Sequence, residues 1–216
     1  MLFLNIGDGY SSGCCTGSKY FTANTDPFFQ GAAPLVEHPD SRPGSFINQL
    51  AEVWKANVIT FARHRTTIEE ILHLKDQTIE LIKGQNAQTI VFFGIPNLYS
   101  QILNDEYLVL DGYDISNDLL DEELYVNLCQ TKEDQDITNK IQEIKTFIQE
   151  ISKIVYKVII YRTTCDSIEL SNLPSNVINT DLNIVDKLLE NYKPHRRGYF
   201  DTRAYRSLKK EFIHLL

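Results

Sequence analysis

An apolar run that ends in a glycine-rich turn stands at residues 2–13, with the sequence LFLNIGDGYSSG. The run from Leu2 to Ile6 has the length and the large apolar side chains that are typical of a buried strand. Gly7, Asp8 and Gly9 follow at once, and residues of these types mark a tight loop. The stretch therefore predicts a buried strand that enters a tight loop.

Further apolar runs alternate with segments of helical periodicity along the rest of the chain. We predict strands at 57–61, 89–93, 154–161 and 175–180, and helices at 46–54, 68–83, 134–151 and 202–215. Thr67 and Asp201 are the expected N-caps of two of these helices. Strands that alternate with helices imply a sheet covered on both faces. We therefore expect an α/β fold, a three-layer α/β/α sandwich with a mostly parallel sheet of about five strands. Residues 1–216 are expected to form a single domain.

The composition excludes several classes of protein. The chain has 216 residues, of which 43% are hydrophobic, and this fraction excludes full disorder. Its net charge of -8 argues against a dedicated nucleic-acid-binding protein, which usually carries a basic face. No apolar stretch approaches the roughly 18 residues of a membrane span, and the run at 2–6 lacks the basic lead of a signal peptide. We expect neither a nucleic-acid nor a membrane partner, and a location in the cytoplasm or in a virion.

Metal and cofactor sites are not indicated by the sequence. The chain has four cysteines, Cys14, Cys15, Cys129 and Cys165. They include no C-x-x-C pair, and this absence excludes a zinc ribbon and a thioredoxin-like motif. Reduced thiols are the expected state in the compartments named above. The chain also lacks the glycine-rich loops that bind phosphates or dinucleotides. We therefore predict no metal and no cofactor.

The stretch IGDGYSSG at residues 6–13 resembles the first block of the SGNH, or GDSL-type, hydrolases, which is commonly written G-D-S-Y-x-x-G. In that family the block follows the first strand and its serine is the nucleophile. This chain has Gly9 at the matching position. The resemblance continues at residues 41–50, which are similar to the lead into the family's first helix, and at 57–72, which are similar to its next strand, loop and helix. The resemblance implies the fold of that family, in a degenerate form that lacks the nucleophile.

Three other catalytic blocks of the family have altered counterparts in this chain. His64 and Arg65 stand where the family has a glycine that stabilises the oxyanion through its backbone. Asn97, in the stretch GIPN, lies one position out of register with the family's oxyanion asparagine. His195 stands where the D-x-x-H block ends, but Tyr192 occupies the position of the aspartate.

These departures predict a domain that has lost hydrolytic competence. Acyl transfer needs an activated hydroxyl, a base and donors to the oxyanion, and Gly9 has no side chain. Arg65 would place a cation in the pocket, and His195 lacks an orienting carboxylate. We therefore predict a pseudoenzyme that acts as a binding or structural module, and a phage-encoded virion protein is one form that it could take. The alternative is an esterase or deacetylase with a displaced nucleophile, Ser11 or Ser12, and His195 as its base.

The same positions suggest what such a module would bind. Asp8 has two interpretations, a carboxylate that orders the loop or a ligand of a substrate hydroxyl. The basic residues near the strand ends either bind an anion or pair with the acidic loops at 104–106 and 111–123. A small anionic or sugar ligand in the cleft would contact Asp8, Gly9, His64, Arg65, Asn97 and Arg196. A protein partner or a homo-oligomer is also expected.

Overall fold

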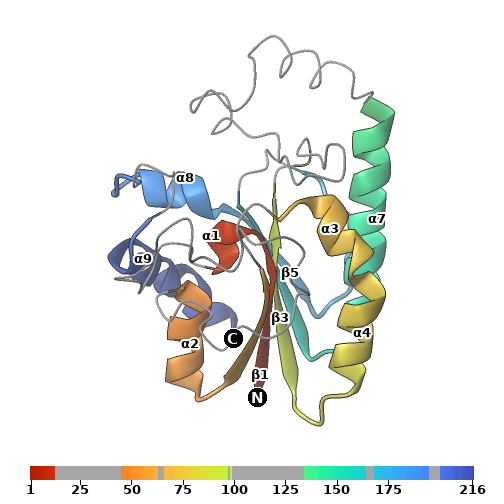
Figure 1. Cartoon of the computed structure of the whole chain (residues 1–216), viewed down its shortest axis with the longest axis horizontal. Helices are drawn as coiled ribbons and strands as arrows, with labels where there is room; N and C mark the ends of the chain where they lie inside the picture. The colour runs from red at the N-terminus through yellow and green to blue at the C-terminus, as the bar shows by residue number, and fades with distance from the viewer. Residues whose placement is uncertain (13–44, 63–65, 97, 99–133, 164–167, 195–199) are drawn as a thin grey trace, which may run out of the picture.

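Five parallel strands form one sheet in the order β2-β1-β3-β4-β5 (Figure 1). The computed structural model describes residues 1–12, 45–62, 66–96, 98, 134–163, 168–194 and 200–216. The strands are β1 (Leu2–Gly7), β2 (Asn57–Ala62), β3 (Thr89–Ile95), β4 (Lys157–Arg162) and β5 (Val177–Asn183). Within these ranges every strand pairing is parallel, so the predicted parallel sheet is confirmed.

Helices cover both faces of this sheet, as the alternation of elements predicted. They are α1 (Gly9–Ser12), α2 (Phe46–Trp54), α3 (Ile68–His73), α4 (Lys75–Lys83), α7 (Asp134–Ser152), α8 (Ile184–Leu189), α9 (Thr202–Phe212) and the 3-10 helix η2 (Ile213–Leu215). In Figure 1, α3, α4 and α7 lie on one side of the sheet, and α2, α8 and α9 lie on the other. The three-layer α/β/α architecture is therefore confirmed.

Each face of the sheet has its own apolar core, because successive side chains of a strand point to opposite faces. On β1, Leu4 and Ile6 belong to the core with α3, α4 and α7, whereas Phe3 belongs to the core with α2, α8 and α9. On β3, Phe93 packs with the first group of helices and Phe92 with the second. A strand that is buried on both faces favours apolar residues at most positions, and this preference explains the largely apolar runs in the sequence.

Both predicted N-caps are present. The Thr67 hydroxyl accepts a hydrogen bond from the Glu70 backbone N–H (3.2 Å), and the Glu70 carboxylate accepts one from the Thr67 backbone N–H (3.3 Å). This reciprocal pair satisfies two backbone donors at the start of α3. The Asp201 carboxylate accepts a hydrogen bond from the Ala204 backbone N–H (2.9 Å) at the start of α9.

Other element boundaries differ from the predictions for local reasons. The helix predicted to be continuous at 68–83 is divided at Leu74, whose φ of -92° and ψ of 8° depart from helical values. The strand predicted from residue 154 begins at Lys157, because the Ile154 N–H still bonds the Ile151 carbonyl (3.0 Å) in a turn after α7. The short helix α8 was not predicted, since its six residues are too few to show a period.

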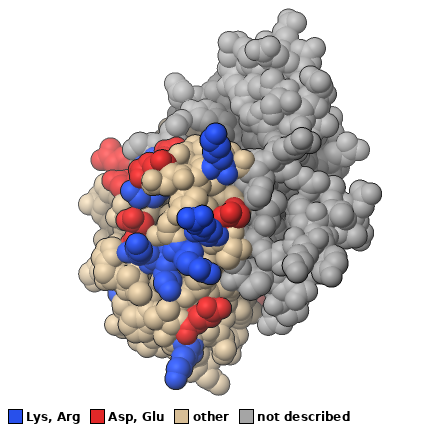
Figure 2. Space-filling view, turned by 90° about the vertical axis from the view of Figure 1, so that its left-hand side faces the viewer, with Lys and Arg blue, Asp and Glu red and all other residues tan. Residues whose placement is uncertain are grey.

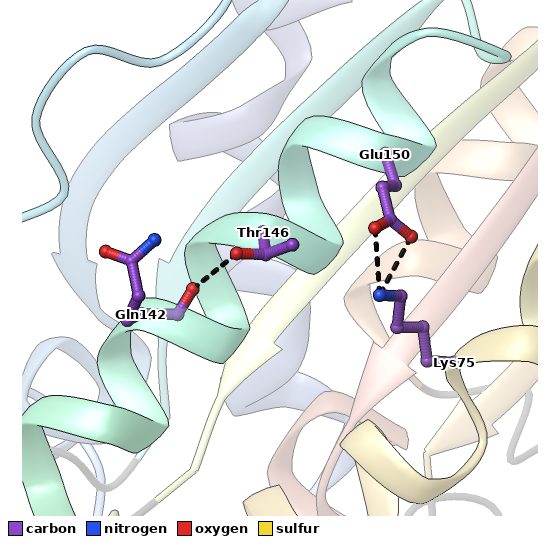
Figure 3. Close-up of polar contacts among 4 residues, drawn as sticks. All are labelled: Lys75, Gln142, Thr146 and Glu150. Atoms are coloured by element: carbon purple, nitrogen blue, oxygen red, sulfur yellow. Dashed lines mark hydrogen bonds and ion pairs between the residues drawn. The ribbon is translucent and has the colours of Figure 1, made fainter.

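Ion pairs link helices of the same layer at the surface. The Lys75 ammonium on α4 contacts the Glu150 carboxylate on α7 at 2.9 Å, and the Thr146 hydroxyl on α7 donates to the Gln142 carbonyl at 2.9 Å (Figure 3). Lys140 on α7 pairs with Glu69 on α3. Partly exposed pairs of this kind typically contribute about 0–1 kcal/mol each. The apolar cores therefore account for most of the packing between the layers.

Four aromatic rings form a cluster on the face of the sheet that α2, α8 and α9 cover. They are Phe46 of α2, Phe92 of β3, Tyr161 of β4 and Phe212 of α9. Phe46 and Phe212 are stacked, with centroids 4.7 Å apart. Tyr161 meets both rings edge-on, at 5.5 Å from Phe46 and 5.4 Å from Phe212. Such pairs add to the free energy that burial of the rings contributes. The cluster attaches α9 to both α2 and the sheet.

Ser11 of α1 packs so closely against the carboxyl ends of β1 and β3 that both strands have a glycine there. The Ser11 side chain lies against both Gly7 and Gly94, and a Cβ atom at either glycine would overlap its hydroxyl. A Cβ at Gly94 would also lie 2.9 Å from the Tyr161 ring. Gly7 has in addition a φ of +156°, which side chains rarely allow. Ser11 therefore fills the space that two missing side chains leave.

We expect Phe212→Ala to lower the free energy of unfolding by about 3–5 kcal/mol, because it removes a fully buried ring from the aromatic cluster. Ile213→Ala is the matched control, since the neighbouring Ile213 is 39% exposed. The control should change stability by less than about 1 kcal/mol. Urea denaturation of the three proteins measures both effects, and equal losses in the two variants would contradict this account of the cluster.

Gly94→Ala should destabilise the fold by about 1–3 kcal/mol, because its methyl group would overlap Ser11 and Tyr161. The control is Gly84→Ala at the end of α4, where the nearest atom to the new Cβ would be 3.5 Å away and the backbone is right-handed helical. That control should be neutral or slightly stabilising. Thermal melts of both variants test the contrast, which fails if Gly94→Ala melts at or above the wild-type temperature.

Candidate functional site

The candidate site lies at the carboxyl edge of the sheet, where β1 and β3 are neighbours. The segment after β1 leads to α2 on one face, and the segment after β3 leads to α7 on the other. Connections that leave two adjacent strands for opposite faces create a crevice at which α/β proteins bind ligands. Residues 8–12, between β1 and α2, stand at this point.

Asp8 orders the turn through hydrogen bonds to the backbone. Its Oδ1 atom accepts from the N–H groups of Tyr10 (3.0 Å) and Ser11 (3.2 Å). Its backbone carbonyl accepts from the Ser12 N–H (3.0 Å). These bonds satisfy donors at the start of α1 in the manner of an N-cap. They match the first of the two interpretations of Asp8, the carboxylate that orders the loop.

The second oxygen of Asp8 is also bonded within the protein. The Thr163 Oγ1 atom, just after β4, lies 2.6 Å from Asp8 Oδ2 and 3.1 Å from the Ile95 carbonyl oxygen. One hydroxyl has one proton, so it cannot donate to both oxygens at the same time. The Ile95 carbonyl also accepts the Thr163 backbone N–H (2.9 Å), so the hydroxyl proton can bond the closer oxygen, that of Asp8.

Burial raises the pKa of Asp8 from 3.8 to about 6, although its hydrogen bonds from Thr163, Ser11 and Tyr10 act in the opposite direction. The side chain is only 5% exposed, so its charged form loses most of its hydration. Asp8 therefore changes charge just below neutral pH. A group of this kind at a strand end is typical of functional sites, but structural networks also shift pKa values.

Gly9 opens α1 and is buried there. It brings no side chain to the position that follows Asp8. The next hydroxyls along α1 belong to Ser11 and Ser12, which are 0% and 3% exposed. The Ser12 hydroxyl donates to the Gly9 carbonyl (3.1 Å), and the Ser11 hydroxyl lies between Gly7 and Gly94. Both serine side chains are therefore enclosed by the protein.

A second group of buried polar atoms lies beneath the turn. The Asn5 amide donates to the Ser11 carbonyl (3.0 Å) and accepts a long hydrogen bond from the Tyr161 hydroxyl (3.4 Å). Burial raises the pKa of Tyr161 well above its usual range, so the phenol stays protonated and remains a donor. The Ser11 Oγ atom has no hydrogen-bond partner of suitable geometry among the described residues, although Tyr161 lies beside it. The hydrogen bond from Asn5 to the Ser11 carbonyl thus ties the backbone of α1 to β1.

The structure brings four of the predicted site residues together on one turn: Asp8, Gly9, Ser11 and Ser12. The other five lie outside the described residues, so their placement relative to this turn stays a prediction: His64, Arg65, Asn97, His195 and Arg196. Within the described ranges, no group of three or more His, Cys, Asp or Glu side chains could hold a metal ion. In the same part of the chain, no helix is long and apolar enough to cross a membrane.

Thr163, Asn5 and Tyr161 were missed from the sequence, although two of them carry a detectable signal. Asn5 is a polar residue inside an otherwise apolar strand, and a buried amide of this kind needs partners. Thr163 directly follows a buried strand, at the same edge as Asp8. Tyr161 gives no such signal, because a tyrosine in a central strand is ordinary.

Comparisons with known proteins identify the fold. No protein-family model matches this chain, and no curated protein matches it. Among solved structures, a lipase from a goat rumen metagenome is similar with a TM-score of 0.52 and 15% identity, over 98% of this chain and 95% of that one. A member of the lipolytic protein G-D-S-L family from Veillonella parvula is similar with a TM-score of 0.51 and 10% identity, over 100% of this chain and 98% of that one. The chain therefore has the fold of the G-D-S-L lipolytic proteins, as the motif at residues 6–13 predicted.

Proposed function

We propose that this chain is a catalytically impaired member of the SGNH type that acts as a binding or structural module. The observation that carries the proposal is Gly9, which opens α1 at the carboxyl end of β1 and brings no nucleophile to the turn. A hydrolase of this type needs a hydroxyl at that point, since the covalent step requires one. The proposal explains why the turn is well ordered although its reactive group is missing.

The environment of the two neighbouring serines supports the proposal. A displaced nucleophile would need an accessible hydroxyl within about 3 Å of a base. Ser12 already donates to the Gly9 carbonyl, and Ser11 is packed against two glycines. Moving either hydroxyl to a substrate would require the turn to rearrange, and even a 1 Å misplacement costs about a hundredfold in rate.

The role proposed for Asp8 is to hold the turn. Both of its carboxylate oxygens have partners inside the protein, and its backbone carbonyl begins α1. The residues predicted to contact a small anionic or sugar ligand would act around this turn, with Arg65 and Arg196 as the cations. A protein partner or a second copy of the chain would be bound by the same module, in the cytoplasm or in a virion that the chain helps to assemble.

Fluorophosphonate labelling tests the loss of catalysis, because the probe reacts with activated serines. We expect no adduct on the wild-type protein, measured by intact mass, while an active G-D-S-L lipolytic protein is labelled in parallel. An adduct mapped to Ser11 or Ser12 that disappears in His195→Ala would overturn the proposal and identify the nucleophile of the alternative esterase or deacetylase.

Gly9→Ser is the matched variant for this experiment. It adds one hydroxyl at the position where the resembling family has its nucleophile. Labelling of Gly9→Ser, but not of the wild type, would attribute the loss of reactivity to position 9 alone. If neither protein is labelled, other residues of the site also prevent the reaction, as Arg65 and Tyr192 predict.

The structural role of Asp8 predicts how Asp8→Asn changes the pH dependence of stability. The folded-state pKa of about 6 lies above the unfolded value of 3.8, so between these pH values the folded protein binds the extra proton. The contribution of Asp8 to stability therefore falls as pH rises through this window. Asparagine keeps similar hydrogen bonds without a charge. The stability of the wild type relative to Asp8→Asn should fall by up to about 3 kcal/mol between pH 4 and 7.

Urea denaturation of both proteins across this pH range measures the difference. A relative stability that rises with pH would show that the surroundings favour the carboxylate, and the structural role would then need a cationic partner for Asp8. Gln49→Glu is not a suitable control, because Gln49 is itself buried. Asp186→Asn serves instead, since Asp186 lies exposed in the first turn of α8.

A further inference from the structure

Positive charge is concentrated near the C-terminal end of this acidic chain. Residues 187–210 hold eight of the 21 Lys and Arg residues but only two of the 29 Asp and Glu residues. The remainder of the chain is correspondingly more acidic than the net charge of -8 suggests. Figure 2 shows Lys and Arg side chains gathered near the middle of one face of the molecule, with Asp and Glu side chains around them. This face is the left-hand side of Figure 1, where α8 and α9 lie.

Helix α9 supplies four of these cations. One stripe of the helix is buried in the core and includes Tyr205, Leu208 and Phe212. The cationic face of α9 lies outside this stripe, and we define it as Arg203, Arg206, Lys209 and Lys210. Arg203, Arg206 and Lys210 are exposed, and none of the four forms an ion pair with another residue of the described ranges.

The stability of α9 does not account for this face. Cations in the last turn, here Lys209 and Lys210, interact favourably with the helix dipole. Arg203 stands in the first turn, where the same dipole disfavours a cation, and the acidic group at this end of α9 is the N-cap Asp201, whose carboxylate bonds the Ala204 N–H. The neighbouring Lys187 of α8 pairs with Glu190 at 2.9 Å and thus shows the ordinary arrangement of a surface cation.

We propose that the cationic face of α9 binds an acidic segment of a protein partner. Arginine and lysine are the side chains that pair with carboxylates, and arginine does so in a bidentate manner. The face spans about 10 Å along the helix, from Arg203 to Lys210. This is close to the Debye length of about 8 Å at physiological salt, so a short acidic peptide would be attracted by the whole face.

The surrounding charge favours a short peptide over a nucleic acid or a membrane. Both of these carry negative charge over distances much longer than the Debye length. Either would extend beyond the cationic face onto the acidic remainder of the molecule and be repelled there. Glu211 lies on α9 itself, and both it and Glu190, which directly follows α8, act electrostatically on Lys187. The inference is independent of the loss of catalysis, since an active hydrolase could bind a partner through α9 equally well.

Binding of a fluorescein-labelled tetra-glutamate peptide, whose extended length of about 13 Å is close to that of the face, is followed by fluorescence anisotropy and tests the proposal on the full chain. The wild-type protein should bind the peptide at about 20 mM salt and release it progressively towards about 300 mM. The double variant Arg206→Glu/Lys210→Glu should bind at least about tenfold more weakly, because two attractions become repulsions. Lys83→Glu/Lys153→Glu is the matched control, since it makes the same charge change at two exposed lysines outside α8 and α9.

The control variant should bind within about twofold of the wild type. Equal weakening in both double variants would show that only net charge matters and would overturn the proposal. Failure of the wild type to bind the peptide would overturn it as well. A single-stranded oligonucleotide of the same length and vesicles rich in phosphatidylserine are tested in parallel. Tighter binding to either of them than to the peptide would overturn the proposal and identify a nucleic acid or a membrane as the ligand of the face. A second variant, Arg203→Ala/Arg206→Ala, and thermal melts of every protein separate loss of binding from loss of folding.

Discussion

Close packing at the end of β1 is the constraint on which the rest of the site depends. The Ser11 side chain occupies the space above Gly7 and Gly94, so the strands β1 and β3 and the helix α1 meet without a gap. Asp8 closes the turn from its other side through bonds to two backbone N–H groups and to Thr163. These contacts hold the turn against β1, β3 and the residue that follows β4.

The contacts that order this turn do not depend on a side chain at position 9. The side chains that order the turn lie within the protein: Asp8 and Thr163 bond each other, and Ser11 packs against Gly7 and Gly94. Position 9 takes no part in these contacts through a side chain, so a glycine there leaves the packing intact. A turn built in this way can keep its shape after the nucleophile has been lost. This is the physical basis for proposing a module that binds without hydrolysis.

Much of the fold was predictable, because it rests on patterns that a sequence displays directly. The buried strands appear as largely apolar runs, and the caps Thr67 and Asp201 appear as short polar residues before helical periods. The break at Leu74 and the helix α8 were not predictable, since each depends on a few residues whose conformation the tertiary packing decides. At the candidate site, Asp8 and Gly9 were found through the motif at residues 6–13. Thr163 was not, because its contact with Asp8 joins residues 155 positions apart.

The position of β1 within the sheet has a consequence for how the protein folds. β1 lies between β2 and β3, so it can pair on both edges only after residues up to Ile95 are available. Its pairing therefore closes long loops, and parallel sheets with such distant contacts fold slowly. Until then, an apolar strand with two open edges is exposed to association with other chains. Folding during synthesis therefore leaves the β3 edge of β1 unpaired until Ile95 has been added to the chain.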